Sequence, residues 1–410
     1  MELTTNKLKR IDFNKLTNIF FIGFAFSIPI SKALVSIFMA LMILSWLAEG
    51  KFLDKLNIIK HDKLSLTFMF LIGFSFLSLL WSPDILYALD FIIRKYWHYL
   101  TIPIILTSLK LEYIKYILNA FLTSMFISEI MSYGIFFEIW TYKNILPTDP
   151  SPFINHIDYS IFLAFALMII LTKLFKKNEI KWKIFYLFYF LTGISNLFIN
   201  GGRTGQIAFL ISIFIMVLIY FKTSFRIILS SVIGIALTLT LAYNFSPNFK
   251  NRISQLEVDI INISNNNFSG SVGQRVSLWI IGSKIFIDNP LLGKGIGGEM
   301  EDTNAYSELL NINYTKKSDY HNTFVQYAVQ LGILGLLVPI FVFYILLTLK
   351  FKTKEYKLLT VSFSLLFFMH SMGGFSFHIM NPLVLLCTFA ALFNAISYQE
   401  SLGLNIPEEQ

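Results

Sequence analysis

The sequence predicts an all-α polytopic membrane protein, and its composition is the first reason. Hydrophobic residues make up 55% of the 410 residues and charged residues 14%, with a mean hydropathy of +0.63. A soluble domain would carry about 25% charged residues. The second reason is that apolar runs recur at about the 20 residues that a helix needs to cross a ~30 Å hydrocarbon core. These observations exclude a soluble enzyme.

Apolar windows predict about twelve membrane-spanning helices. They lie near residues 17–31, 33–48, 64–81, 97–109, 113–139, 158–175, 184–199, 205–221, 226–243, 323–349, 358–372 and 380–398. The window at 323–349 is long and contains Gly332, so we expect this helix to bend there or to begin outside the lipid. The stretch 81–96 is expected to lie at the membrane surface.

The distribution of Lys and Arg predicts the orientation. If the N-terminus is cytoplasmic, the cytoplasmic segments hold 21 of the 33 Lys and Arg residues, and the five short outer loops hold 5. Basic residues are retained on the cytoplasmic side of a membrane, so we expect both termini in the cytoplasm. This asymmetry accounts for the net charge of +8, which we therefore do not read as a nucleic-acid signal. The first apolar segment lacks a small-residue cleavage site, so we expect no removable signal peptide.

One connection is far longer than the others and divides the chain into three parts. Residues 1–243 hold the first nine predicted helices, and residues 244–322 form a long periplasmic loop. Residues 323–410 hold the last three helices and a cytoplasmic tail. Long loops in a compact protein are usually functional, so we expect the functional site at this loop.

The long loop contains three recognisable segments. A polar run, "NNNFSGSVG", covers about 265–273 and is expected to be flexible. An amphipathic helix is predicted from Gln274 to Ile287, with an apolar side that suits a membrane surface. The turn "GKGIGG" resembles a phosphate-binding loop but lacks its Gly-Lys-Ser/Thr ending, so we interpret it as a glycine turn.

The stretch "FINGGRTGQIAF" places Arg203 between two apolar helices, beside three glycines. A charge this close to hydrocarbon is costly and usually marks a site, and glycines let a ligand approach the backbone. The alternative is an arginine that extends its side chain to the lipid headgroups. Arg203 lies on the outer side, against the charge bias, and this favours a binding site.

Three more basic residues are candidates for an anion site. Arg275 stands in the first turn of the amphipathic loop helix, where an exposed charge without a function is the commoner alternative. Arg94 and Lys95 are two further charges on the outer side. Guanidinium groups suit bidentate binding of phosphate, so the sequence predicts an anionic ligand.

The segment "KSDYHNTFVQYAVQLGILGLL" carries His321 where the long loop enters an apolar helix. Histidine is the commonest general base at neutral pH, and Asp319 or Tyr320 is placed to orient it. The alternative is a helix cap formed by Asn322 or Ser318, with the histidine only a polar residue at the interface. The two interpretations are compatible, because a cap would fix the helix end that presents the base.

Metal and disulfide chemistry have little support in the sequence. Five of the six histidines fall near outer helix ends (98, 156, 321, 370 and 378). Their separations match no metal motif, so we expect neither a structural metal nor a cofactor. The single cysteine, Cys387, lies in an apolar run and is expected to be a packing residue.

Two arginines and a histidine on one side of a membrane bundle suggest a specific chemistry. The arginines suit a pyrophosphate leaving group, and the histidine suits deprotonation of an acceptor hydroxyl. Together, Arg203, Arg275 and His321 indicate group transfer from a lipid pyrophosphate, with arginines in place of a metal.

Three motifs, "GGRTG", "RVSLWIIGSKIFIDNPLLGKGIG" and "HNTFVQYAVQLGILG", resemble in this order the bacterial O-antigen ligase superfamily. That superfamily includes lipopolysaccharide O-antigen ligases, O-antigen polymerases and protein O-oligosaccharyltransferases. The motif detail is confined to about 200–335, and the first half of the chain resembles the family only in topology. The resemblance implies a membrane-embedded (GT-C-like) glycosyltransferase of the Gram-negative inner membrane. Its implied donor is an undecaprenyl-pyrophosphate-linked glycan on the periplasmic face.

The resemblance also implies roles for individual residues. Arg203 and Arg275 match the family's pyrophosphate-binding arginines, and His321 matches the histidine proposed to activate the acceptor hydroxyl. The implied reaction inverts the anomeric centre and needs no metal. The histidine in its His-Asn context favours a ligase, whose acceptor is a sugar of the lipid A core.

Two alternatives stay open beside the ligase. An O-antigen polymerase would join undecaprenyl-linked repeat units at the same site. A transporter of polysaccharide-linked lipids would use the arginines as anion-binding charges, and transporters often show inverted repeats and helices interrupted at the midplane. No repeat is visible in the sequence and the key charges lie at one face, which favours an enzyme.

Overall fold

The computed structural model describes residues 12–176, 179–221, 223–297, 299–312, 314 and 319–406, with the backbone only at 299–301. All regular structure in these residues is helical. The α-helices are α1 (Phe13–Ser27), α2 (Lys32–Glu49), α3 (Phe52–Ile59), α4 (Lys63–Leu77), α5 (Ile85–Tyr96), α6 (Thr101–Ser108), α7 (Ile114–Phe136), α8 (His156–Phe175), α9 (Ile180–Ile199), α10 (Arg203–Phe221), α11 (Phe225–Phe245), α12 (Pro247–Ser264), α13 (Gly270–Asp288), α14 (Glu299–Leu309), α15 (Thr323–Thr348), α16 (Lys354–Gly373) and α17 (Met380–Ser401). Short 3₁₀ helices lie at Ser78–Leu80, Trp97–Leu100 and Leu111–Tyr113.

The protein is a multi-pass membrane protein. Nine stretches of the described residues are long and apolar enough to cross a membrane; they contain α2, α4, α7, α8, α9, α10, α11, α15 and α17. The other three predicted segments are also helical, although α1 and α6 are shorter than 18 residues and α16 begins with charged side chains. The all-helical, multi-pass prediction is confirmed, and the number of twelve spans stays a prediction.

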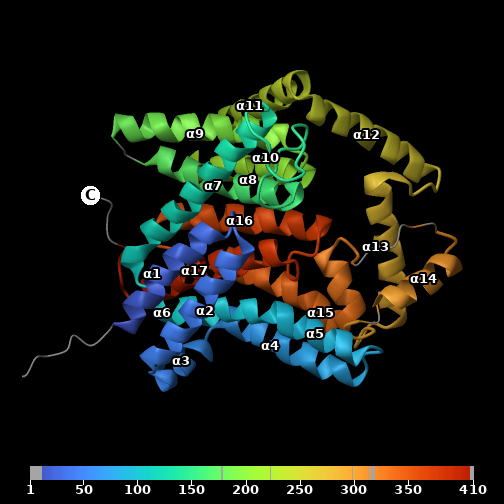
Figure 1. The fold of residues 1–410 in the computed structure, drawn as a ribbon, viewed down its shortest axis with the longest axis horizontal. Helices are drawn as coiled ribbons and strands as arrows, with labels where there is room; N and C mark the ends of the chain where they lie inside the picture. Colours follow the sequence, from blue (N-terminus) through green and yellow to red (C-terminus); the bar gives the residue numbers. More distant parts are fainter. Residues whose placement is uncertain are drawn as a thin grey trace, which may run out of the picture.

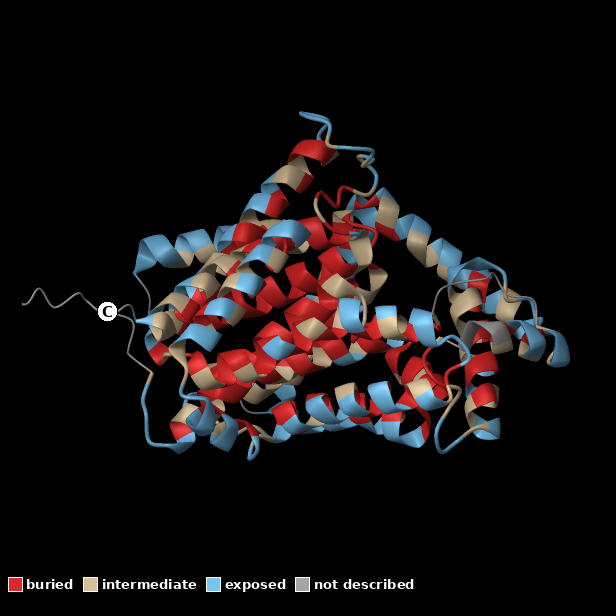
Figure 2. Ribbon diagram, turned by 60° about the horizontal axis from the view of Figure 1, so that its bottom comes forward, coloured by how far each residue is buried: buried red, intermediate tan, exposed pale blue. Residues whose placement is uncertain are grey.

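Two helices form the centre of the bundle. Helices α8 and α17 bury 89% and 94% of their most apolar windows inside the protein, whereas α11 buries only 6%. Figure 2 shows the same gradient, with buried residues gathered in the middle of the molecule and exposed ones along the outer helices. In a membrane protein an exposed apolar helix faces lipid, so α11 lies at the periphery and α8 and α17 form the core.

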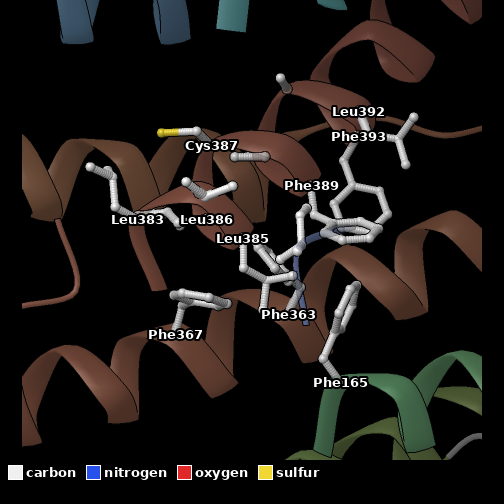
Figure 3. Close-up of a cluster of buried hydrophobic side chains, with 14 of the residues drawn as sticks. Phe165, Phe363, Phe367, Leu383, Leu385, Leu386, Cys387, Phe389, Leu392 and Phe393 are labelled. Carbon is white, nitrogen blue, oxygen red and sulfur yellow. The ribbon is translucent and has the colours of Figure 1, made fainter. Parts of the chain in front are cut away.

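The core is packed with phenylalanine. The Phe165 ring lies 4.6 Å from that of Phe389 and 4.9 Å from that of Phe363, centroid to centroid, both in edge-to-face geometry. This arrangement is favoured by the quadrupoles of the rings. Figure 3 shows the cluster together with Cys387. The cysteine is fully buried, which confirms the prediction that it is a packing residue.

The bundle has two ends of different character (Figure 1). The C-terminus lies at one end, and helices α12, α13 and α14 cover the other, which we call the loop face. Helices α10, α15 and α17 begin at the loop face, and α16 ends there, because α16 runs antiparallel to its neighbours. Charged and polar residues at these four helix ends therefore converge, although they are far apart in the chain.

The long connection is more ordered than its sequence suggests. One helix was predicted, from Gln274 to Ile287; the structure contains it as α13 and adds α12 and α14. The polar run at 265–273 was expected to be irregular, but its last four residues already belong to α13. Both missed helices carry many polar residues, so a search for apolar windows passes over them. The start of α12 nevertheless has a cap, since Ser246 Oγ accepts a 3.1 Å hydrogen bond from the N–H of Phe249.

Helix α15 is broken at Gly332, as predicted. Gly332 has φ +64° and ψ −152°, a conformation that is essentially restricted to glycine. The turn "GKGIGG" supplies N–H donors for carbonyl groups of α15 that lie just before the break. The N–H of Lys294 donates to the carbonyl of Val329 at 2.8 Å, and the N–H of Gly295 donates to the next carbonyl at 2.9 Å. The glycine-turn interpretation is confirmed, and the turn fastens the long loop to α15.

Substitution of Gly332 by alanine is expected to destabilise the protein. An added Cβ would collide with the carbonyl oxygen of Leu291, and the backbone conformation alone costs a non-glycine residue about 1–3 kcal/mol. The thermal unfolding midpoint of purified Gly332→Ala in detergent should fall by several degrees. Gly73→Ala is the matched control, because a Cβ at Gly73 meets nothing within 4 Å. Equal midpoints for the two variants would contradict this account.

Candidate functional site

The junction before α10 places Arg203 on the loop face. Two glycines connect α9 to α10, and a Cβ at Gly202 would collide with the carbonyl oxygen of His156 and with Ser160. The junction can therefore lie directly against α8 only because Gly202 has no side chain. This close approach fixes the first residue of α10, Arg203, above the centre of the bundle.

A half-buried carboxylate holds the same junction. Asp149 Oδ1 accepts a 3.0 Å hydrogen bond from the N–H of Gly201, and Asp149 Oδ2 lies 2.7 Å from His156 Nδ1. Burial on its own would raise the pKa of Asp149, but the hydrogen bonds from His156 and from the Gly201 N–H outweigh it and lower that pKa below its usual range. Asp149 is therefore a fixed anion that anchors the turn leading into Arg203.

Helix α13 brings a second arginine to the start of α10. A Cβ built on Gly373, the last residue of α16, would lie 3.3 Å from Thr204 Oγ1 and 3.9 Å from Arg275 Nη1. Thr204 follows Arg203 in α10. The end of α16 is thus the point where the two predicted arginine segments meet, and a glycine at this point permits their close approach.

Among the described residues, the acidic neighbour of the two arginines is Asp259, which interacts electrostatically with Arg203. Arg203 and Arg275 interact electrostatically with each other, but neither guanidinium forms an ion pair with a described carboxylate. Arg203 Nη1 is buried and makes no hydrogen bond with the described part of the chain. Burial lowers the pKa of Arg275. Holding two partly desolvated cations together is unfavourable without a counter-charge, so the arrangement indicates an anionic ligand.

A third arginine, Arg252, belongs to the same group and was not singled out from the sequence. It lies on α12, interacts electrostatically with Arg203, and its Nε atom is buried without a hydrogen-bond partner among the described residues. Because α12 was not predicted, Arg252 looked like one of several charges in a long loop. Ser246 followed by Pro247 is a typical helix start and was the available signal.

His321 is held in an uncommon conformation by its neighbour Asp319. Its backbone φ is +49°, which is rare for a residue with a side chain and often occurs at functional sites. Asp319 Oδ1 accepts a 2.7 Å hydrogen bond from the N–H of His321 and lies 3.3 Å from its Nδ1. This pairing favours the tautomer with the proton on Nδ1 and the basic lone pair on Nε2. The imidazole is about one-third exposed, at 34%, so substrate can reach it.

Asn322 caps helix α15, as one interpretation of the sequence proposed. Its Oδ1 accepts hydrogen bonds from the N–H groups of Phe324 (2.9 Å) and Val325 (3.2 Å). Ser318, the other proposed cap, lies outside the described residues. Tyr320 is fully buried, and its hydroxyl lies 2.7 Å from Thr303 Oγ1. Of the two residues proposed to orient His321, Asp319 is therefore the one in contact with its ring.

The start of α15 is tied to the end of α16. The hydroxyl of Thr323 donates a 2.9 Å hydrogen bond to the carbonyl of Gly374 and accepts a 3.0 Å bond from the N–H of Ser376. Thr323 follows His321 by two residues, and Gly374 adjoins Gly373, which lies beside Arg275. The structure thus brings the predicted base and the predicted arginines to one neighbourhood around the end of α16.

Three of the other four predicted outer histidines, His98, His370 and His378, differ from His321 in their surroundings. His98 and His370 are buried, and His370 Nδ1 lies 2.7 Å from Ser376 Oγ. Burial, and secondly the charge of Lys95, lowers the pKa of His378 to about 3, so that imidazole is a weak base. His156 is paired with Asp149, as described above. His321 and His156 are therefore the two histidines that could accept a proton from substrate.

Arg94 and Lys95 lie outside the arginine group. Arg94 Nε forms a 2.6 Å ion pair with Asp90 one turn earlier on α5, and both side chains are exposed. The charged neighbours of Lys95 are Lys32, Arg94 and Asp90. Lys95 is also near His378, in the connection between α16 and α17. Lys95 therefore lies near the connection between α16 and α17, which begins at Gly374.

A comparison with known families matches part of the chain. Residues 187–340 match the family model Wzy_C, described as O-Antigen ligase. This segment is an O-antigen ligase family domain. It contains Arg203, Arg275 and His321, and it implies a membrane glycosyltransferase of the O-antigen ligase or polymerase type with lipid-linked glycan substrates. No curated protein matches the chain.

A bulky side chain at the end of α16 is expected to weaken anion binding. Gly373→Leu would place a side chain between Thr204 and Arg275 and displace a ligand held there. Affinity for farnesyl pyrophosphate, measured by calorimetry on purified protein, should fall by about tenfold or more, because charged hydrogen bonds are worth about 1.5–3 kcal/mol each. Gly234→Leu on the peripheral helix α11, where a Cβ meets nothing within 4 Å, is the control. Wild-type affinity in a folded Gly373→Leu would show that the ligand binds elsewhere.

Proposed function

We propose that this protein is an O-antigen ligase. It transfers an O-antigen polysaccharide from undecaprenyl pyrophosphate to a hydroxyl of the lipid A core oligosaccharide, in the periplasmic leaflet of the Gram-negative inner membrane. The observation that supports the proposal is that both arginine segments and the segment of His321 approach the end of α16. Arg275 and Thr204 lie beside Gly373, and Thr323, two residues after His321, bonds to Gly374. Arg203, Arg275 and His321 lie within the O-antigen ligase family domain.

Arg203 and Arg275 hold the pyrophosphate of the donor. Each guanidinium can donate two parallel N–H bonds to phosphate oxygens, which fixes both position and orientation. The two cations also stabilise the negative charge that develops on the leaving group, a task that a divalent metal performs in other enzymes. We therefore propose a reaction without a metal ion.

His321 activates the acceptor. Its Nε2 takes the proton from a hydroxyl of the core sugar while the hydroxyl oxygen forms a bond to the anomeric carbon. The bond between that carbon and the phosphate oxygen breaks, and its electron pair remains on undecaprenyl pyrophosphate. Attack opposite to the leaving group inverts the anomeric centre. Asp319 stabilises the imidazolium that forms at His321, because its carboxylate faces Nδ1.

Replacement of His321 tests the base. His321→Gln is expected to lower the rate of glycan transfer by about 10²- to 10⁴-fold, the usual contribution of a general base. His156→Gln is the matched variant, because glutamine can still donate a hydrogen bond to Asp149 but cannot act as a base; it should retain most of the activity. Transfer is measured with purified protein in EDTA, so wild-type activity there also tests the metal-free reaction. Loss in His156→Gln with activity in His321→Gln would assign the base to His156 instead.

Lipopolysaccharide profiles of a deletion strain test the choice of reaction. A strain complemented with Arg203→Ala or His321→Ala should produce lipopolysaccharide without O-antigen and accumulate full-length polymer on undecaprenyl pyrophosphate. Lipid A core that carries single repeat units would instead indicate a polymerase. Accumulation of polymer-linked lipid on the cytoplasmic side would indicate a transporter. Wild-type profiles from both variants would refute the site.

A further inference from the structure

Helix α12 is anchored directly over the junction that presents Arg203. Asn248, in its first turn, donates hydrogen bonds from Nδ2 to the carbonyls of Ile199 (3.1 Å) and Thr148 (3.0 Å). Ser246, its cap, donates from Oγ to the carbonyl of Phe198 at 2.8 Å. These bonds hold the start of α12 against the end of α9. Helix α9 ends at Ile199, shortly before Arg203 begins α10.

Arg252 lies one turn after Asn248 and therefore on the same face of α12. Its charged neighbours include Arg203 and Asp149. Arg252 Nη1 donates a 3.0 Å hydrogen bond to Gln255 Oε1, while Nε is buried and has no hydrogen-bond partner among the described residues. A guanidinium needed only for solubility would extend into solvent. Arg252 instead keeps a buried donor next to another cation.

The carboxylates around the arginines are already engaged. Asp149 accepts the N–H of Gly201 and pairs with His156. Asp259, which interacts electrostatically with Arg203, accepts a 2.9 Å hydrogen bond from the N–H of Val272 at the start of α13. No ion pair joins either carboxylate to an arginine within the described residues. Three guanidinium groups thus share a site whose nearby carboxylates make their hydrogen bonds to backbone N–H groups and, for Asp149, also pair with His156.

We propose that Arg252 is a further substrate-binding residue that recognises the second phosphate of the donor and makes the site selective for a lipid diphosphate over a lipid monophosphate. The inference rests on the proposed function. Two arginines are enough for the oxygens of one phosphate when each binds in bidentate mode. The donor carries a charge on each of two phosphates, and cleavage adds a further ionisable oxygen to the leaving group. A third guanidinium matches this additional charge.

The test compares two probes that differ by one phosphate, farnesyl pyrophosphate and farnesyl monophosphate. Their affinities are measured by calorimetry on the full chain in detergent. Arg252→Gln is expected to lower the affinity for the diphosphate by about 10- to 100-fold, the range expected for a charged hydrogen bond, and to change the affinity for the monophosphate less than about twofold. Arg252→Lys, which keeps the charge but loses the planar fork, should lie between Arg252→Gln and the wild type. It also serves as the readout if Arg252→Gln does not fold.

Lys250→Gln is the matched control for net charge. Lys250 precedes Arg252 by two residues on α12, is exposed, and its Nζ lies 5.6 Å from the ring of Tyr243. It should bind both probes as the wild type does. An equal loss in Lys250→Gln would show that only the general positive field matters, and would overturn the proposal. Equal losses for both probes in Arg252→Gln, or no loss, would also overturn it.

Two more variants separate this inference from the proposed function. Arg203→Gln and Arg275→Gln should weaken binding of both probes, because these residues hold a phosphate in either ligand. If both variants bind both probes normally, the anion site of the proposed function is wrong. If they lose binding but Arg252→Gln does not discriminate between the probes, only the role of Arg252 is refuted.

Discussion

The site is constrained by the repulsion between arginine side chains that lie close together and form no ion pair with the carboxylates that the structure describes. Partly buried like charges drive a structure apart unless the backbone around them is held rigidly. Arg203, Arg252 and Arg275 come from three different helices, so this repulsion acts directly between α10, α12 and α13. The surrounding hydrogen bonds and glycine contacts are the features that oppose it. Binding of a polyanion would relieve the repulsion and stabilise the folded protein at the same time.

Glycines and carboxylates oppose this repulsion in different ways. Gly202 and Gly373 let helix ends approach so closely that a methyl group would disturb the contact. Asp149 makes its hydrogen bonds to the backbone of the junction and to His156, and it interacts with Arg252 only through space. The negative charge near the site therefore stabilises the scaffold while the guanidinium groups stay available. An ion pair in the same place would have neutralised the site.

Much of the fold could be predicted because the membrane imposes simple rules. Each apolar window corresponds to a helix, and the glycine at 332 breaks the helix in which it was noticed. Arg203 and His321 could be selected because a charge or a base beside an apolar helix has few ordinary explanations. Polar helices have no such signature, which is why α12 and α14 were missed, and Arg252 with them.

The grouping of residues could not be predicted, because it depends on contacts between distant segments. The sequence places Arg94, Lys95, Arg203 and Arg275 on the same predicted side, and spacing alone does not show which of them meet. Packing separates them: α13 crosses the end of α16 beside Arg275, whereas Arg94 is neutralised by Asp90 on its own helix. Likewise, nothing in the sequence marks Gly373 or Thr323 as part of the site. Their positions there follow from the contact between α15 and α16.

The break at Gly332 divides α15 into an outer segment, before the glycine, and an inner segment, after it. The outer segment, which begins just after His321, is bonded at its broken end to the main chain of Lys294 and Gly295. At its start, Tyr320 packs against Gly282 of α13, the helix that carries Arg275. His321 and Arg275 therefore lie on two segments that pack against each other, while the inner segment of α15 stays with the lipid-embedded helices. A tilt of the outer segment about Gly332 would widen or narrow the access of a bulky glycan to the site. It would preserve the distance between His321 and Arg275.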